Sequence, residues 1–266
     1  MLRMRELRRS EAAVMHKKGM EFLTLRMREL RRSEAAVMHI IRKGKGRKYN
    51  MKKYTTIIFD LDGTLLYTLE DLKDAINYAL ECNGYEKRTI KEVKRFVGNG
   101  VRKLVERAVP KNTPIEEVDK VFKDFKIYYD KHATDKTMVY EGIPHILDVL
   151  KQKGYNLAIV SNKLQEAVDV LQKRFFSDTI SIAVGDKAGC KRKPSPDSVI
   201  EVMKYFNSNK ENTLYIGDSE VDIETAGNAG IDCISVSWGF REKGELLQAG
   251  ATIIVNTPEE LINKII

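Results

Sequence analysis

The stretch that decides the fold runs from Thr55 to Leu65 and reads TTIIFDLDGTL. Its first half is apolar and β-branched, which favours a buried strand, and the strand ends at two aspartates, Asp60 and Asp62. Side chains on a strand alternate between its two faces, so carboxylates spaced two residues apart leave the strand on the same side. Such a pair suits the binding of a divalent cation and the division of work between a nucleophile and an acid/base.

Three further segments place polar side chains where phosphate chemistry needs them. Residues 157–163 read LAIVSNK, an apolar run followed by a hydroxyl, an amide and an amine that can donate to phosphoryl oxygens. Residues 191–197 read KRKPSPD and carry cations before a proline that suits a helix start. Residues 213–222 read TLYIGDSEVD and add two carboxylates four residues apart, after a serine that can cap a helix. The first stretch is therefore not an isolated acidic turn.

In this order and spacing, the four segments resemble the motif set of the haloacid dehalogenase superfamily of phosphatases. The resemblance covers residues 51–266. It implies an α/β fold, with a Rossmann-like parallel sheet, helices on both faces and an inserted all-α helical-bundle cap domain. The implied catalytic core is 51–68 with 138–266, the helical cap is 69–137, and a basic extension, disordered or loosely helical, occupies 1–50.

The hydrophobic pattern by itself also predicts a parallel sheet that is covered by helices on both faces. Strands are expected near 54–60, 156–160, 180–184, 212–216, 232–236 and 252–255. Helices are expected near 143–153, 164–175, 196–207, 219–229 and 257–265. The inserted region has four helical runs and no convincing strand, with helices expected at 69–83, 89–97, 100–108 and 115–129. Residues 67–68 and 139–142 are the expected hinge strands, in which Gly142 supplies backbone freedom.

The resemblance implies a role for each motif residue. Asp60 is the expected nucleophile, and Asp62 is expected to protonate the leaving alkoxide and then to activate water. The catalytic set is completed by Ser161 and Lys193. The expected ligands of Mg²⁺, the implied cofactor, are Asp60, Asp218, the backbone carbonyl of Asp62 and, in a supporting role, Asp222. The residues expected to bind phosphoryl oxygens are Gly63, Thr64 and Asn162. Lys163, by contrast, is equally consistent with a solvated face.

A second candidate region is the cap segment 96–103, which reads FVGNGVRK. Glycines on both sides of Asn99 predict a tight loop that leads into a helix start, where Gly100 and Arg102 suit a substrate carboxylate or second phosphate. An ordinary helix–helix turn with solvated charges is the alternative. The loop resembles the substrate-specificity loop of phosphoglycolate phosphatase-like enzymes. Tyr67 departs from the Asp or Asn that relatives commonly carry there, which puts cap closure or substrate choice in doubt.

The excess of Lys and Arg over Asp and Glu comes from the first fifty residues. They hold 15 of the 46 Lys and Arg and 5 of the 38 Asp and Glu, so the remainder carries 31 basic and 33 acidic residues. The core therefore offers no sign of nucleic-acid binding. Residues 2–16 recur verbatim as 25–39, which indicates a recent duplication or translated upstream sequence, and Met51 is the expected ancestral start. A basic arm for nucleic acid or an anionic membrane is the competing interpretation.

Composition argues against several classes of protein and of metal site. No apolar run reaches the length of a membrane span, and no apolar stretch marks a signal peptide. Three scattered cysteines and four unclustered histidines argue against a disulfide framework and against a His or Cys metal site, which favours a reducing cytoplasm.

The function predicted from these observations is Mg²⁺-dependent hydrolysis of a small phosphate monoester, with 2-phosphoglycolate as the first candidate, through an aspartyl-phosphate. The expected partner is a small phosphorylated metabolite, without nucleic acid for the core and without a membrane, and the expected state is a monomer or homodimer. A pyrophosphatase, a sugar-phosphate phosphatase or a nucleotide phosphatase of the same superfamily remains open. A non-catalytic binding protein on this fold is the alternative from a different class.

Overall fold

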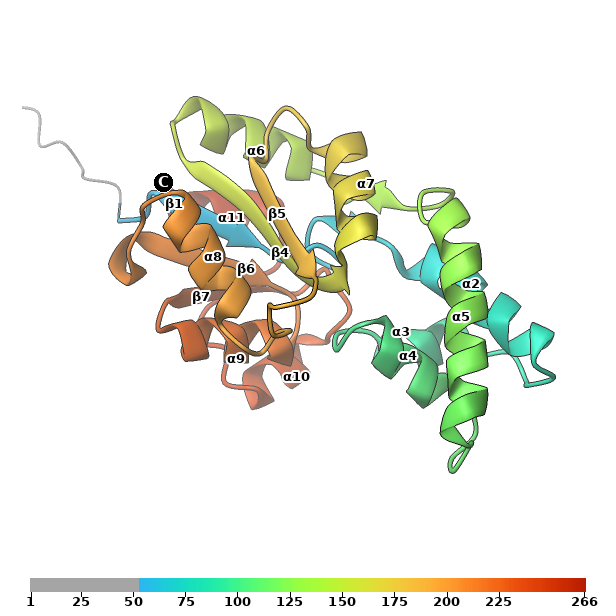
Figure 1. Cartoon of the computed structure of the whole chain (residues 1–266). Coiled ribbons are helices and arrows are strands. Elements are labelled where there is room, and N and C mark those ends of the chain that lie inside the picture. The colour runs from blue at the N-terminus through green and yellow to red at the C-terminus, as the bar shows by residue number, and fades with distance from the viewer. Residues whose placement is uncertain (1–52) are drawn as a thin grey trace, which may run out of the picture. The chain divides into compact units, whose positions relative to one another are not determined.

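The computed structural model describes residues 53–266, so the structure predicted for residues 1–50 lies outside the described residues. Within this part, a six-stranded parallel sheet has the strand order β5-β4-β1-β6-β7-β8 (Figure 1). The strands are β1 (Thr56–Phe59), β4 (Asn156–Leu164), β5 (Ile182–Asp186), β6 (Thr213–Gly217), β7 (Asp232–Val236) and β8 (Ile254–Val255). The order reverses direction at β1, which is the kind of position where ligands of open α/β sheets bind.

Helices cover both faces of this sheet, as the alternation along β1 requires. Ile57 and Phe59 pack in one hydrophobic cluster with residues of α6, α7 and α11, whereas Ile58 packs in another with residues of α8 and α9. The helices are α6 (Ile143–Gln152), α7 (Gln165–Phe175), α8 (Asp197–Tyr205), α9 (Glu220–Ala229), α10 (Lys243–Gln248) and α11 (Pro258–Ile265), with a 3-10 turn at Lys210–Asn212. The predicted fold class is confirmed.

Four helices supply most of a third hydrophobic cluster, to which Phe240 from the loop after β7 also belongs, and we call these helices the cap. They are α2 (Leu69–Cys82), α3 (Ile90–Phe96), α4 (Val101–Ala108) and α5 (Ile115–His132). Two short antiparallel strands, β2 (Leu66–Tyr67) and β3 (Met138–Val139), carry the chain into and out of them. The division of the chain into a core at 51–68 and 138–266 and a cap at 69–137 stays a prediction.

Some element boundaries differ from those expected. The strand expected to end at residue 160 continues to Leu164, because β4 pairs with β5 again at Leu164 and Asp186, past a register shift after Val160. Helix α10 was not expected, since Leu246 is its one buried residue and its apolar pattern is too sparse to detect. Among residues 53–266, no helix combines the length and apolarity that a membrane crossing requires.

Candidate active site

The site lies where the parallel strands end. Strands β4, β1 and β6 are neighbours in the sheet, so the residues at their carboxyl ends meet at one edge. A pocket opens there between this edge and the cap. It is lined by Asp60, Asp62, Ser161, Asn162, Lys163, Lys193, Asp218, Ser219, Phe240 and Arg241, and on the cap side by Leu72, Val97, Gly98, Gly100, Val101 and Leu104.

Three buried carboxylates form the centre of the site. Oxygens of Asp60, Asp218 and Asp222 lie within 4.8 Å of one another. Glycines permit this approach: a Cβ at Gly63 would lie 2.3 Å from Oδ2 of Asp218, and one at Gly217 would lie 2.3 Å from the carboxyl carbon of Asp222. Burial raises the pKa of Asp218 to about 7, assisted by the charge of Asp222, and burial likewise holds the pKa of Asp60 well above its usual range.

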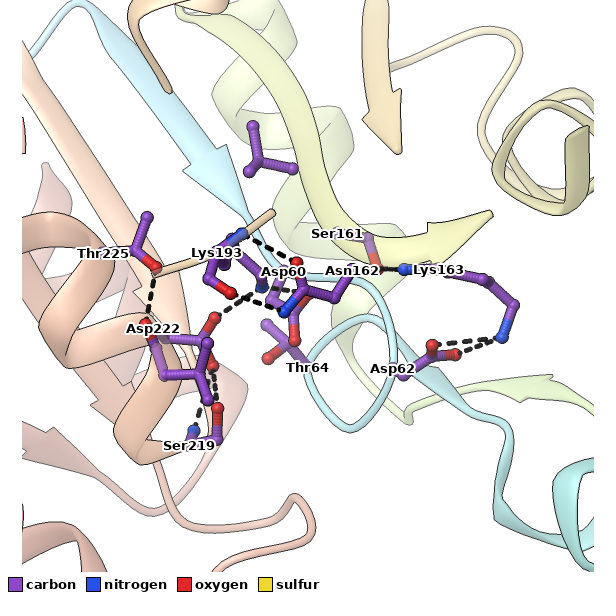
Figure 2. Close-up of polar contacts among 12 residues, drawn as sticks. Asp60, Asp62, Thr64, Ser161, Asn162, Lys163, Lys193, Ser219, Asp222 and Thr225 are labelled. Atoms are coloured by element: carbon purple, nitrogen blue, oxygen red, sulfur yellow. Dashed lines mark hydrogen bonds and ion pairs between the residues drawn. The ribbon is translucent and has the colours of Figure 1, made fainter. Parts of the chain in front are cut away.

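Lys193 neutralises part of this charge (Figure 2). Its ammonium donates to Oδ1 of Asp60 at 2.8 Å, to Oδ1 of Asp222 at 2.7 Å and to the hydroxyl of Tyr215 at 3.1 Å. Burial by itself would lower the pKa of Lys193, but the charges of Asp222 and Asp60 raise it well above its usual value. The lysine therefore stays charged between two carboxylates.

Asn162 fixes the backbone of this lysine. Its side-chain oxygen accepts from the amide of Lys193 at 2.8 Å, and its nitrogen donates to the carbonyl of Lys193 at 3.0 Å. The same nitrogen lies 3.1 Å from the carbonyl of Gly98 in the cap loop. One side chain thus holds Lys193 in place and connects the strand end to the cap.

The two remaining carboxylates are held by the turns that follow the strands. Ser219 precedes α9, and its amide and hydroxyl donate to Oδ2 of Asp222 at 3.0 and 2.7 Å, which confirms the expected helix start there. Asp218 accepts from the hydroxyl of Thr64 at 3.2 Å and from the amide of Phe240 at 2.6 Å. Thr64 is fully buried and does not line the pocket, so this contact orients a carboxylate.

Asp62 lies apart from the three clustered carboxylates. Its carboxylate accepts from the ammonium of Lys163 at 2.9 and 3.1 Å (Figure 2). Lys163 is buried, and its ammonium also lies over the ring of Tyr129 in α5, 4.8 Å from the ring centroid. The solvated face considered for Lys163 is therefore wrong. The two aspartates that open the first motif therefore occupy different electrostatic surroundings, Asp60 beside Lys193 and Asp62 beside Lys163.

The structure separates the three candidate residues of the cap loop. Gly100 lines the pocket, but Asn99 and Arg102 do not. Arg102 pairs with Glu106 at 3.1 Å and with Asp119. The side-chain oxygen of Asn99 accepts from Arg107 at 2.7 Å. In this arrangement neither Asn99 nor Arg102 reaches the site, and their contact with a substrate stays a prediction.

Arg241 is a pocket residue that sequence reasoning did not assign. Its guanidinium pairs with Glu220 at 2.8 Å and donates to the carbonyls of Val97 at 3.0 Å and Lys94 at 3.3 Å, at the end of α3. The segment 237–241 reads SWGFR, and nothing in these letters indicates the backbone partners of Arg241. Arg241 therefore joins the loop after β7 to the cap beside the pocket.

A comparison with known families decides the assignment. The model of the haloacid dehalogenase-like hydrolases matches residues 57–236, a span that contains the first motif, both lysines and all four carboxylates. The chain belongs to this family. The predicted recognition is confirmed, and with it the prediction that the protein is a hydrolase.

Individual relatives agree with the family assignment. The chain is 35% identical over 188 residues to a phosphoglycolate phosphatase of Aquifex aeolicus, covering 69% of this chain and 85% of the relative. It is 32% identical over 204 residues to a phosphoglycolate phosphatase of Psychrobacter arcticus, covering 74% and 89%. A solved structure from Lactobacillus delbrueckii subsp. bulgaricus has a TM-score of 0.78 and 40% identity, over 80% of this chain and 99% of that one.

Proposed function

We propose that this hydrolase is a Mg²⁺-dependent phosphatase that hydrolyses a small phosphate monoester through an aspartyl-phosphate on Asp60. The observation that carries the proposal is the position of Lys193, whose ammonium contacts Asp60 within a cluster of three buried carboxylates. The proposal is supported by the meeting of a carboxylate able to act as a nucleophile, a fixed cation and further carboxylate oxygens at one end of the pocket. The relatives named phosphoglycolate phosphatase support 2-phosphoglycolate as the first substrate to test.

The proposed reaction has two steps. A carboxylate oxygen of Asp60 attacks phosphorus, the bond from phosphorus to the leaving oxygen breaks, and Asp62 gives its proton to the leaving alkoxide. Asp62 then takes a proton from a water molecule that attacks the same phosphorus, which releases phosphate and restores Asp60. Lys193 and Ser161 are placed to stabilise the charge on the phosphoryl oxygens, because both line the pocket beside Asp60.

The clustered carboxylates fit the proposed metal. Asp60, Asp218 and Asp222 offer the hard oxygen ligands that Mg²⁺ prefers, and their oxygens lie within 4.8 Å of one another. The backbone carbonyl of Asp62 completes the proposed set. Bound Mg²⁺ would neutralise charge on the phosphoryl group.

We expect Mg²⁺ to stabilise the protein more at pH 8 than at pH 5. Because the pKa of Asp218 rises from 3.8 to about 7 on folding, the metal-free folded protein holds a proton that the unfolded chain releases. The stability of the metal-free protein therefore falls as pH rises through this window, whereas the ionised cluster binds the cation. The measurement is the change in Tm between EDTA and Mg²⁺ at both pH values.

Two variants test whether the effect of Mg²⁺ comes from the proposed site, one at a proposed ligand and one as a control outside the pocket. Asp218→Asn should lose the Mg²⁺-dependent shift in Tm. Asp232→Asn should keep it, because Asp232 pairs with Lys53 and Tyr54 outside the pocket. An equal shift for Asp218→Asn and the unaltered protein would place the metal elsewhere and contradict the proposed ligands.

Substrate choice is tested with phosphate release by the full chain from a panel of esters and pyrophosphate. The proposal expects 2-phosphoglycolate to give the highest kcat/KM. A preference for pyrophosphate, a sugar phosphate or a nucleotide would keep the reaction and replace the substrate. A folded protein that releases phosphate from none of them in Mg²⁺ would favour the binding protein considered from sequence.

A further inference from the structure

The ion pair between Lys163 and Asp62 is a second charged group in the pocket, distinct from the group around Lys193. Lys163 extends from the end of β4, and its side chain is 1% exposed. Among residues 53–266, this lysine supplies both hydrogen bonds to the Asp62 carboxylate, at 2.9 and 3.1 Å. Burial of two charges costs free energy that their attraction does little more than offset, so such a pair is weak evidence for a stabilising role.

The cap supplies the other side of this contact. The ring of Tyr129 lies 4.8 Å from the ammonium of Lys163, a distance at which a ring face attracts a cation. Tyr129 is itself fixed, because its ring stacks on Phe125 with centroids 5.3 Å apart and both belong to the cap's hydrophobic cluster. Lys163 therefore lies between the carboxylate of the first motif and a rigid part of α5.

We propose that Lys163 is a positioning residue that holds the Asp62 carboxyl group in place for proton transfer, donating to one of its oxygens while the other carries the proton given to the alkoxide, and that Tyr129 makes this position depend on the cap. The inference rests on the proposed function, in which Asp62 protonates the leaving alkoxide. Asp62 follows β1 on a turn, and without Lys163 its side chain loses both of the contacts that orient it. A proton donor displaced by about 1 Å costs rate without any change in the nucleophile.

The leaving group gives this role a distinctive signature. An alkoxide is strongly basic and needs a proton as the bond to phosphorus breaks, whereas p-nitrophenolate leaves without one. A misplaced Asp62 should therefore slow the hydrolysis of an alkyl phosphate far more than that of p-nitrophenyl phosphate. Damage to the fold or to the nucleophile would slow both esters alike. The parameter to compare is kcat/KM, because it reports the steps up to formation of the aspartyl-phosphate.

The first test is Lys163→Met in the full chain. We expect kcat/KM for the best alkyl ester to fall about 10²-fold, mainly through kcat, and kcat/KM for p-nitrophenyl phosphate to fall by less than about tenfold. Lys187→Met is the matched control, because Lys187 pairs with Glu201 on the surface and should leave both values unchanged. Equal losses for the two esters, or no loss for either, would overturn the proposal.

Substitutions of Tyr129 keep the test decisive if Lys163→Met fails to fold. Tyr129→Leu removes the ring and should show the same preference against the alkyl ester, with a loss of about three- to tenfold. Tyr129→Phe keeps the ring face and should match the unaltered protein. Tyr128→Leu, one position earlier on α5, removes a ring that stacks on Tyr78 and His132 and should leave the ratio between the esters unchanged. A Tyr129→Leu protein with an unchanged ratio would contradict the role of the cap.

Asp62→Asn separates this inference from the proposed function. If Asp62→Asn slows the alkyl ester selectively but the Lys163 and Tyr129 variants do not, the proposed function stands and the positioning role is wrong. If Asp62→Asn affects both esters equally, Asp62 is not the proton donor, and the proposal for Lys163 falls with it.

Discussion

Asp60→Asn should abolish phosphate release, with a fall in kcat of about 10⁴-fold or more. The substitution keeps the shape of the side chain and removes the nucleophilic oxygen, so the loss should appear for every ester of the panel, including p-nitrophenyl phosphate. Its binding surface stays in place, because Asn162, Lys193 and the cap residues that line the pocket are untouched. The measurement is steady-state phosphate release in Mg²⁺, together with Tm to show that the protein folds.

Asp186→Asn is the matched control for this result. Asp186 also ends a strand of the same sheet, but it pairs with Arg192 and does not line the pocket. It should keep kcat within about threefold of the unaltered protein. An Asp60→Asn protein that is folded and retains comparable activity would show that another group attacks phosphorus.

Lys193→Met should cost both stability and activity. The ammonium of Lys193 is the contact that Asp60 and Asp222 share, and its removal leaves two buried carboxylates without their cation. The cost of breaking a buried ion pair in this way is about 3–5 kcal/mol in the free energy of unfolding. The size of the effect depends on pH: burial raises the pKa of Asp60, so this carboxylate loses its charge as pH falls through that raised value, and the destabilisation should shrink with it.

Chemical denaturation of Lys193→Met and Lys187→Met checks this expectation. Lys187 and Glu201 are each more than one third exposed, and removal of such a surface pair should cost about 0–1 kcal/mol. Equal stability for the two variants would mean that the buried carboxylates are protonated or hydrated without Lys193, and the electrostatic account of the site would be wrong.

The sheet could be predicted because its signal is local. Each core strand contains a short apolar run, and the polar residues that follow the apolar runs of β1, β4 and β6 are therefore brought to one edge by topology alone. The extension of β4 to Leu164 could not be predicted in the same way. Ser161 to Lys163 read as a polar turn, and they remain in the strand because Leu164 pairs with Asp186 of a strand that follows later in the chain.

Some contacts of the site residues could not be predicted because the partner side chains lie far away in the sequence. The sequence alone leaves Lys163 consistent with solvent, because its partners Asp62 and Tyr129 each lie far away in the chain. Arg102 shows a partial exception. Its partner Glu106 lies four residues later on the same helix, a spacing that a sequence displays, whereas nothing in the sequence points to Asp119 on α5.

The most direct test of the proposed mechanism is to trap the phosphoryl group on the protein. The full chain and Asp62→Asn, whose second step should be slow, are mixed in Mg²⁺ with p-nitrophenyl phosphate, whose leaving group needs no proton from Asp62, and quenched in acid within one turnover. Mass spectrometry of the peptides should then find one phosphoryl group on Asp60, and more of it in Asp62→Asn. Phosphate release without a modified Asp60 in either protein, or a phosphoryl group on another residue, would contradict the mechanism.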